Sequence, residues 1–319
     1  MKTLHHILCA TDFSPPSRHA ADRAARLARE TGATLTLLHV TPAPAWQALQ
    51  QWLGTSHASA RQLDEQRRLE LDTLASELTD GHHGRPLATH RTGVVVDAIV
   101  DEAAALLGTV LIVLAARGAS FLRRLAIGTT SERLVRRARQ PVLVVRTSAR
   151  AVYRRALVAV DFSPWSRPAL DAARRVAPHA EWTLFAAYSV PFEEKLRFAG
   201  VDEAVVDHYR RVARDHATRQ LHALAADAGL VPSQWRPCIV EGEASLRLLE
   251  QEQTQDADLV VLGKHGQSAA EDLLLGSVTQ HVLAEGSCDV LITSVPDEPG
   301  RPRPRMSTLD APPPERGDG

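Results

Sequence analysis

Hydrophobic residues along the chain follow two alternating patterns. Short, nearly continuous apolar runs are separated by longer stretches in which apolar residues recur every three or four positions. The first pattern is typical of strands buried on both faces, and the second of amphipathic helices. In the first half of the chain we therefore expect strands at Ile7–Thr11, Leu35–Val40, Leu87–Arg91, Val110–Leu114 and Pro141–Val145.

Helical patterns fill the intervals between these strands. The expected helices cover Pro15–Arg29, Arg61–Leu78, Val96–Leu107 and Thr130–Arg139. Regular alternation of strand and helix implies right-handed βαβ crossovers. The fold class predicted for this half is α/β and Rossmann-like, a five-stranded parallel sheet with helices on both faces.

The second half of the chain repeats the first. The segment ATDFSP at residues 10–15 returns as AVDFSP at residues 159–164, an offset of 149 residues. Isolated glycines keep the same spacing within one residue: Gly93, Gly118 and Gly128 return as Gly242, Gly266 and Gly276. Anchors that share one offset indicate a duplicated unit rather than chance similarity.

The repeat divides the chain into two tandem domains. We assign residues 1–147 to unit 1 and 153–295 to unit 2, with Thr147 to Tyr153 as a short linker. Unit 2 has predicted strands at Ala156–Val160, Thr183–Ala187, Arg236–Val240, Leu259–Leu262 and Val290–Thr293, a long helix within Glu193–Ala228 and a final helix at Ser277–Glu285. The proline-rich residues 296–319 are expected to be a disordered, extended tail.

Composition agrees with two globular α/β domains. The chain has 319 residues, 44% hydrophobic and 4% aromatic, so the cores must be built from Ala, Leu and Val. The net charge is −1, but residues 1–150 carry +6 and residues 151–319 carry −7. We interpret this difference as favouring pairing of the two halves over a nucleic-acid partner.

The cysteines and the apolar runs indicate the cellular compartment of the protein. Cys9, Cys238 and Cys288 are three cysteines without a CxxC motif or zinc-ligand spacing, which favours a reducing compartment. The apolar run at residues 7–10 is too short for a signal peptide, and no run approaches the length of a membrane span. We expect a cytoplasmic protein with no membrane partner.

Candidate chemistry lies in the loop after the fourth strand of unit 2. The loop has the pattern G-x2-G-x9-G-S, with glycines at Gly263, Gly266 and Gly276 followed by Ser277. Glycines without Cβ atoms let the backbone approach a ribose and phosphates, and a helix N-terminus attracts anions. The alternative is structural: such glycines can serve only positive φ angles, and such a serine can be only a helix cap.

An aspartate at the end of the first strand favours the functional interpretation. In a doubly wound sheet, ligands bind beyond the carboxyl ends of the strands where strand order reverses. Asp161 and Gly263 should therefore face one cleft, in which Asp161 can accept hydrogen bonds from an adenosine. Lys264 and His265 could add positive charge near phosphates.

Taken together, these residues resemble the universal stress proteins. The shared features are the strand-one aspartate, a glycine opening the third helix, the G-x2-G-x9-G-[ST] loop and a terminal PVLVV strand. The resemblance covers about residues 3–147 and 153–295 and implies ATP or another adenine nucleotide as ligand, a Mg²⁺ ion at the phosphates, and little or no turnover. It implies these nucleotide-binding residues: in unit 2, Asp161, Ala187, Gly263, Lys264, His265, Gly266, Gly276, Ser277 and Val278; in unit 1, Asp12, Arg117, Gly118, Gly128 and Thr129.

Unit 1 departs from this motif. Ala115 stands where unit 2 has Gly263, and the extra Cβ lies where the backbone should meet the nucleotide. Arg117, Gly118, Gly128 and Thr129 still match. We therefore predict that unit 2 binds ATP and that unit 1 binds it poorly.

Two other functions are alternatives to nucleotide binding. The first alternative is a slow ATP hydrolase or nucleotide transferase that uses Lys264, His265 and Asp161, although the sequence has no G-x4-G-K-[ST], G-x-S-x-G or H-E-x-x-H motif. The second is a scaffold that binds no nucleotide.

The terminal strands Pro141–Val145 and Asp289–Thr293 are expected to pair antiparallel and join the two units, and a homodimer is expected as well.

Overall fold

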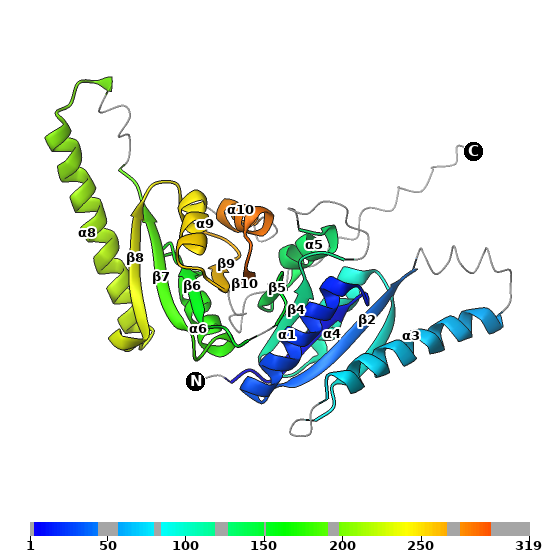
Figure 1. Cartoon of the computed structure of the whole chain (residues 1–319). Helices are drawn as coiled ribbons and strands as arrows, with labels where there is room; N and C mark the ends of the chain where they lie inside the picture. Colours follow the sequence, from blue (N-terminus) through cyan, green and yellow to red (C-terminus); the bar gives the residue numbers. More distant parts are fainter. Residues whose placement is uncertain are drawn as a thin grey trace, which may run out of the picture.

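The structure is a computed structural model, and it describes residues 3–43, 57–79, 84–118, 127–149, 151–190, 198–266 and 275–294. The predicted tail at 296–319 lies outside these residues. Figure 1 shows a twisted central sheet with helices packed against it along its whole width. The same strand and helix order appears twice along the chain.

Unit 1 contains five strands and the helices between them. Its elements are β1 (His6–Thr11), α1 (Pro15–Thr31), β2 (Thr34–Pro42), α3 (His57–Glu77), β3 (Leu87–Gly93), α4 (Val95–Ala105), β4 (Val110–Ala115), α5 (Thr129–Arg137) and β5 (Val142–Val145). Ser14 caps α1 by accepting a hydrogen bond from the Ser17 amide, and Gly32 ends the helix in the left-handed conformation.

Unit 2 follows the same plan. Its elements are β6 (Arg155–Ala159), α6 (Ser166–Val176), β7 (Glu181–Tyr188), α8 (Glu203–Asp227), the 3-10 turn η1 (Pro232–Gln234), β8 (Trp235–Glu241), α9 (Ala244–Thr254), β9 (Leu259–Gly263), α10 (Ser277–Glu285) and β10 (Asp289–Thr293). The helix expected within Glu193–Ala228 is α8, and α10 matches its predicted bounds.

The ten strands form one continuous sheet in the order β3-β2-β1-β4-β5-β10-β9-β6-β7-β8. Within each unit all pairs are parallel, and β1 and β6 lie between the second and fourth strands of their units. The strand order therefore reverses at β1/β4 and at β6/β9, as predicted. The two units meet where β5 pairs antiparallel with β10, with Leu143 opposite Leu291. This confirms the expected pairing of the terminal strands.

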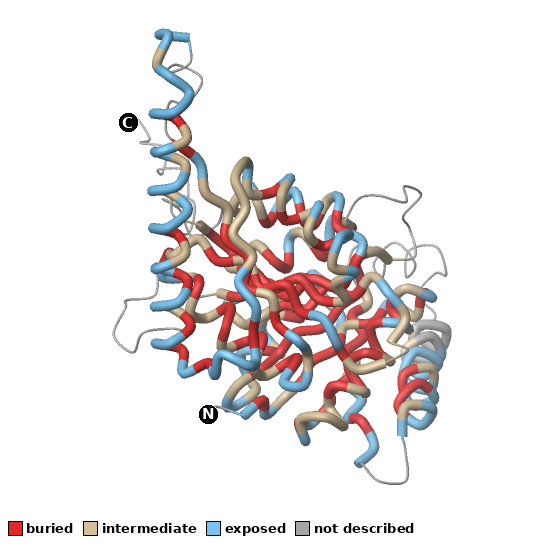
Figure 2. Tube along the Cα trace, turned by 60° about the vertical axis from the view of Figure 1, so that its left-hand side comes forward, coloured by how far each residue is buried: buried red, intermediate tan, exposed pale blue. Residues whose placement is uncertain are grey.

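Helices cover both faces of the sheet and form two apolar layers. One layer contains buried residues of α1, α3, α6 and α8, and the other contains those of α4, α5, α9 and α10. Each layer runs across both units, so the junction between the units lies inside the core rather than beside it. Figure 2 shows this as buried red segments along the middle of the molecule.

A buried polar cluster fixes the junction. Asp289 is 0% exposed and forms an ion pair with Arg23 at 3.2 Å. Its carboxylate also accepts hydrogen bonds from the Tyr153 hydroxyl at 2.7 Å and from the Arg146 and Thr147 amides. The Arg23 guanidinium lies 4.1 Å from the Tyr153 ring centroid. These contacts tie helix α1 of unit 1, the linker and β10 of unit 2 together.

Each unit also holds the end of a helix in the other. The Lys264 ammonium of unit 2 donates to the Arg136 carbonyl at the end of α5, and Arg146 of unit 1 donates to the Leu283 carbonyl at 2.5 Å near the end of α10. A cation at a helix C-terminus satisfies carbonyls that lack helical partners and complements the helix dipole.

Arg23–Asp289 is an ion pair that links the two units. On the basic helix α5, Arg136 and Arg137 pair with Glu132 and Asp97 of their own unit. Backbone pairing of β5 with β10 and apolar packing also join the units. Across the described ranges, no helix combines the length and apolar character needed to cross a bilayer.

Candidate functional site

The end of β6 positions the carboxylate of Asp161. Oδ1 of this residue accepts hydrogen bonds from the Ser163 amide at 3.1 Å, the Ser163 hydroxyl at 2.6 Å and the Ser166 hydroxyl at 3.1 Å. The Ser166 hydroxyl also accepts from the Asp161 amide at 3.2 Å. Three donors on one oxygen fix the orientation of the side chain before any ligand arrives.

A strained residue follows the aspartate in both units. Phe13 has φ 62° and Phe162 has φ 63°, in the left-handed region that non-glycine residues rarely adopt. Such a conformation costs on the order of 1 kcal/mol or more and persists only where surrounding contacts enforce it. The hydrophobic pattern does not predict this turn, and its signal in the sequence is the repeated DFSP segment.

Two glycines, Gly263 at the end of β9 and Gly266 just after it, lie so close to other protein atoms that a side chain would not fit. A Cβ on Gly266 would lie 2.9 Å from Asp161 Oδ2, and a Cβ on Gly263 would lie 2.7 Å from the Trp165 Cβ. Both approaches are closer than a side chain permits. The glycines therefore allow the end of β9 to pack against the turn after β6, which brings the two strand ends to one place as predicted.

Helix α10 presents its N-terminus to the same place. Its N-cap is Gly276, and no side chain caps this end. The Gly276 amide donates to the Lys264 carbonyl at 3.0 Å, and the Thr279 hydroxyl donates to the Gly263 carbonyl at 2.8 Å. These two bonds lock α10 to β9. The first amide groups of the helix, which have no acceptor within it, point toward the strand ends.

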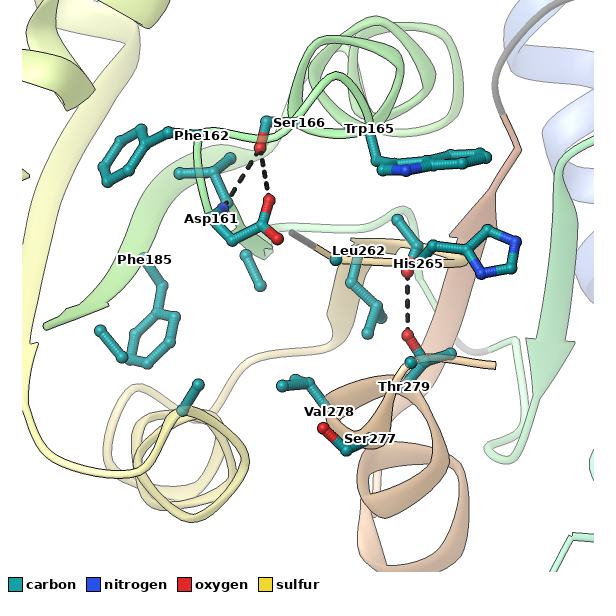
Figure 3. Close-up of a pocket in the computed structure, with 17 residues that line it drawn as sticks. Asp161, Phe162, Trp165, Ser166, Phe185, Leu262, His265, Ser277, Val278 and Thr279 are labelled. Atoms are coloured by element: carbon teal, nitrogen blue, oxygen red, sulfur yellow. Dashed lines mark hydrogen bonds between the residues drawn. The ribbon is translucent and has the colours of Figure 1, made fainter. Parts of the chain in front are cut away.

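A cavity of about 310 Å³ lies between these elements, over the carboxyl ends of β6, β7 and β9 (Figure 3). Its floor is apolar, and its polar rim comes from the β6 turn, the β9 loop and the start of α10. The lining residues are Ala159, Val160, Asp161, Phe162, Trp165, Ser166, Phe185, Ala187, Ala244, Leu262, Gly263, His265, Gly266, Gly276, Ser277, Val278 and Thr279. Eight of the nine unit 2 residues predicted to bind nucleotide are among them.

Lys264 is the exception, and its expected role at the phosphates needs correction. The residue is 6% exposed, and its ammonium reaches α5 of unit 1, where it donates to the Arg136 carbonyl and, at 3.5 Å, to the Ala138 carbonyl. Side chains alternate in direction around the end of a strand, so Lys264 points away when its neighbours face the cavity.

His265 lines the cavity with its backbone more than with its ring. The imidazole packs against the Trp165 indole, with ring centroids 4.6 Å apart and a tilt of 53°. In Figure 3 the ring is turned away from Phe185 and Val278 and lies on the side of Trp165. Trp165, Phe162 and Phe185 were not among the predicted residues, because their contribution to the cavity depends on contacts between strands.

Unit 1 brings its predicted residues together in the same way. A Cβ on Gly118 would lie 2.6 Å from Asp12 Oδ2, and the Gly128 amide donates to the Ala116 carbonyl at 2.7 Å. Thr129 begins α5, whose N-cap, Gly128, has no side-chain cap either. Asp12 is exposed, whereas Asp161 is half-buried. Arg117 lies half-buried beside Gly118.

A histidine pair distinguishes unit 1 on the opposite face of its sheet. The His39 and His90 rings stack with centroids 5.6 Å apart, and His39 Nδ1 lies 2.8 Å from the Thr11 carbonyl. His90 pairs with Asp64 of α3 at 2.8 Å. Burial, together with the nearby His90 and Arg67, lowers the pKa of His39. By sheet register, unit 2 has Ala186 and Ile239 at these positions.

Comparison with known proteins assigns this architecture to a family. The sequence profile of the universal stress protein family matches residues 3–146 and, a second time, residues 152–294. The chain belongs to the universal stress protein family. A universal stress protein of Mycobacterium tuberculosis is 27% identical over 313 residues, which cover 93% of this chain and 97% of that protein. Universal stress protein A homolog 2 of Coxiella burnetii is 27% identical over 144 residues, 45% of this chain and 96% of its own length.

A solved universal stress protein shares the fold. Its crystal structure, from Archaeoglobus fulgidus, covers 91% of this chain and 98% of its own, with a TM-score of 0.59 and 17% identity. A universal stress protein crystallised in complex with cAMP is 27% identical over 45% of this chain and 98% of its own, with a TM-score of 0.32. The two profile matches show that this chain contains two universal stress protein domains in tandem.

Proposed function

We propose that this tandem universal stress protein binds an adenine nucleotide, ATP in the first instance, mainly in the cavity of unit 2. The observation that carries the proposal is the cavity at the β6/β9 switch point, which has a preset carboxylate on one side and an uncapped helix N-terminus on the other. An apolar cavity with a few converging polar groups is the usual form of a small-molecule site. If occupancy of this cavity follows the nucleotide concentration in the cell, the protein would act in a stress response or in signalling.

The distribution of polar groups determines how the nucleotide would lie. The base and ribose would occupy the apolar part near Phe185, Ala187 and Leu262, within reach of the Asp161 carboxylate. The phosphates would face Gly276, Ser277 and Val278 at the start of α10, where amide groups and the helix dipole favour an anion. Gly266 would let the phosphates approach the backbone.

From the charges of the lining residues we predict how Mg²⁺ would affect nucleotide binding. Among the described residues that line the cavity there is no Lys or Arg, and Lys264 points instead to α5. No cluster of three His, Cys, Asp or Glu suited to a metal occurs in the ranges that the structure describes. A Mg²⁺ ion would therefore be held mainly by the nucleotide's own phosphates and would offset charge that the protein leaves uncompensated. ATP should need Mg²⁺ to bind well, whereas cAMP, with one phosphate charge, should not.

Titration calorimetry of the full chain tests the proposal. We expect one site per chain for ATP with Mg²⁺, and at least tenfold weaker binding when EDTA removes the ion. Gly276→Asp should abolish binding, because it places a carboxylate at the phosphate position. The matched variant Gly128→Asp makes the same change in unit 1 and should leave the affinity within about twofold. Two equal sites, no binding, or full affinity in Gly276→Asp would each refute the proposal.

The enzymatic alternative has less support from the geometry. Of its three polar groups, the Lys264 ammonium lies at α5 and the His265 ring packs on Trp165. Asp161 is engaged by three hydrogen-bond donors. None of these groups is placed to activate water beside α10, so we infer a binding module. Fewer than one turnover per minute of labelled ATP is the expected result.

A further inference from the structure

Helix α8 carries an apolar stripe that no other part of the described structure covers. Val205, Tyr209 and Val212 are 42%, 50% and 48% exposed. Their spacing of four and three residues places them on one face of the helix. The opposite face packs on the sheet of unit 2 through Val206, Ala217, Leu221 and Ala225.

The stripe lies on the outer surface of the molecule. Figure 1 shows α8 at one end of the sheet, extending beyond β7 and β8, and Figure 2 shows its outward face exposed along its length. The corresponding helix α3 of unit 1 has one large exposed apolar residue among its described side chains, Leu69. Among the described side chains of the two helices, the stripe therefore belongs to α8.

The full stripe follows a heptad pattern with a charge at each end. Exposed residues continue the alternating spacing of three and four residues in both directions: Asp202, Val205, Tyr209, Val212, His216 and Arg219. This is the spacing by which two helices pack side by side. In the part of the chain that the structure describes, neither Asp202 nor Arg219 forms an ion pair. The Asp202 carboxylate caps α8 through the Ala204 amide at 2.8 Å.

We propose that this stripe is a homodimer interface in which α8 packs antiparallel against α8 of a second copy of the chain. A twofold axis between positions 210 and 211 pairs the stripe residues with one another, with opposite charges at the two ends and apolar side chains at the centre. Asp202 faces Arg219 of the second copy, Val205 faces His216, and Tyr209 faces Val212. A closed twofold interface requires such self-complementarity, and the opposite charges at the two ends permit only the antiparallel direction.

Arg210 and Arg211 lie equally close to the axis, and both are off the stripe. Arg210 would bring two positive charges toward each other there if its charge were not offset. Its guanidinium is held by carboxylates of its own unit, with Glu203 at 3.2 Å, Asp207 at 2.8 Å and Glu241 at 3.1 Å. The β5 and β10 strands already pair with each other within one chain. The α8 contact therefore adds a second copy without disturbing the junction between the units.

Sedimentation equilibrium of the full chain over a concentration series tests this interface. We expect a monomer–dimer equilibrium. Val212→Asp should raise the dissociation constant at least tenfold, since it places a charge in the apolar centre of the contact. The control Ser233→Asp adds the same charge at an exposed residue of η1, outside α8, and should change the constant less than threefold. Melting temperatures within a few degrees of the parent would show that both variants are folded.

A double-mutant cycle tests the direction of packing. Arg219→Gln should raise the dissociation constant about fivefold, because each dimer loses two exposed ion pairs. Asp202→Asn removes the same pairs and keeps a side chain that caps helices well. In the Asp202→Asn background, Arg219→Gln should have no further effect. A monomer at every concentration, a dimer unaffected by Val212→Asp, or additive effects of the two end substitutions would overturn the proposal.

Discussion

The two units share strand order, helix placement and the turn after the first strand, yet they differ at the residues around that turn. Unit 2 has Gly263 packed against Trp165 and a cavity lined by Phe185 and Ala187. Unit 1 has Ala115 at the glycine position and a polar histidine pair on the opposite face of its sheet. Duplication has preserved the scaffold while the side chains at each switch point have diverged, so a shared fold does not imply two equal sites.

The largest effect should come from a residue that only one unit supplies to the junction. Asp289 corresponds to Pro141 in unit 1, and it neutralises the buried Arg23. Asp289→Ala should lower the free energy of unfolding by about 3–5 kcal/mol, because it leaves a buried guanidinium without its carboxylate. Urea denaturation followed by circular dichroism measures the loss. Glu181→Ala, which removes the exposed partner of Arg236, is the control and should cost about 1 kcal/mol or less.

The glycine difference between the units gives the next largest effect. Gly263→Ala should destabilise the protein by about 1–3 kcal/mol, because its Cβ would overlap the Trp165 Cβ. The displaced indole should also change the tryptophan fluorescence, and nucleotide affinity should fall. Ala115→Gly in unit 1 is the reciprocal change and should leave nucleotide affinity unchanged. An unaltered melting temperature in Gly263→Ala would show that the two positions are equivalent after all.

Lys264 offers a way to separate stability from ligand binding. Lys264→Met removes the cation at the end of α5 and should cost about 1 kcal/mol of stability. Because the ammonium points away from the cavity, ATP affinity should stay within about twofold of the parent. Calorimetric titration and thermal unfolding of the same preparation measure both quantities. A tenfold loss of ATP affinity without a loss of stability would show that Lys264 does contribute to nucleotide binding.

The smallest expected effect is a pH dependence confined to unit 1. Since burial lowers the pKa of His39, the folded chain binds this proton only at a lower pH than the unfolded chain, whose His39 has a pKa near 6.5. Stability should therefore fall as the pH drops below about 6.5 and level off below the lowered native pKa. Denaturation at pH 7.5 and 5.5 should show a smaller difference in His39→Gln than in the parent. The groups near His39 are the Thr11 carbonyl, His90, Arg67 and Asp12, and an equal difference in both proteins would contradict the assignment.

Much of the fold could be predicted from the sequence because its signals are local or repeated. The apolar runs of β4 and β9 mark central strands, and the 149-residue offset of DFSP marks the duplication. The antiparallel pairing of β5 with β10 was expected from two exposed strand edges together with the resemblance to the universal stress proteins, and the structure confirms it. Strand order then placed Asp161 beside Gly266, which is the core of the candidate site.

What the sequence did not predict depends on contacts between distant segments. The direction of Lys264 is decided by the carbonyls of α5, which lie 126 and 128 residues away along the chain. The left-handed backbone of Phe162 and the packing of Trp165 on Gly263 depend on how β6 and β9 meet. The exposed stripe of α8 became visible only once burial separated the two faces of the helix. Local pattern carries no information on such contacts.

The β5–β10 junction has a consequence for assembly in the cell. The segment between Val145 and Arg155 is short, so it keeps the two halves at a high effective concentration and favours pairing within one chain over pairing between chains. Opening the junction would expose β5 and β10, and each could then pair with the corresponding partner strand of another copy of the chain. Exchange of whole halves between chains, a domain swap, is then the characteristic way for this protein to misassemble at high concentration. A shorter or stiffer linker should increase that exchange.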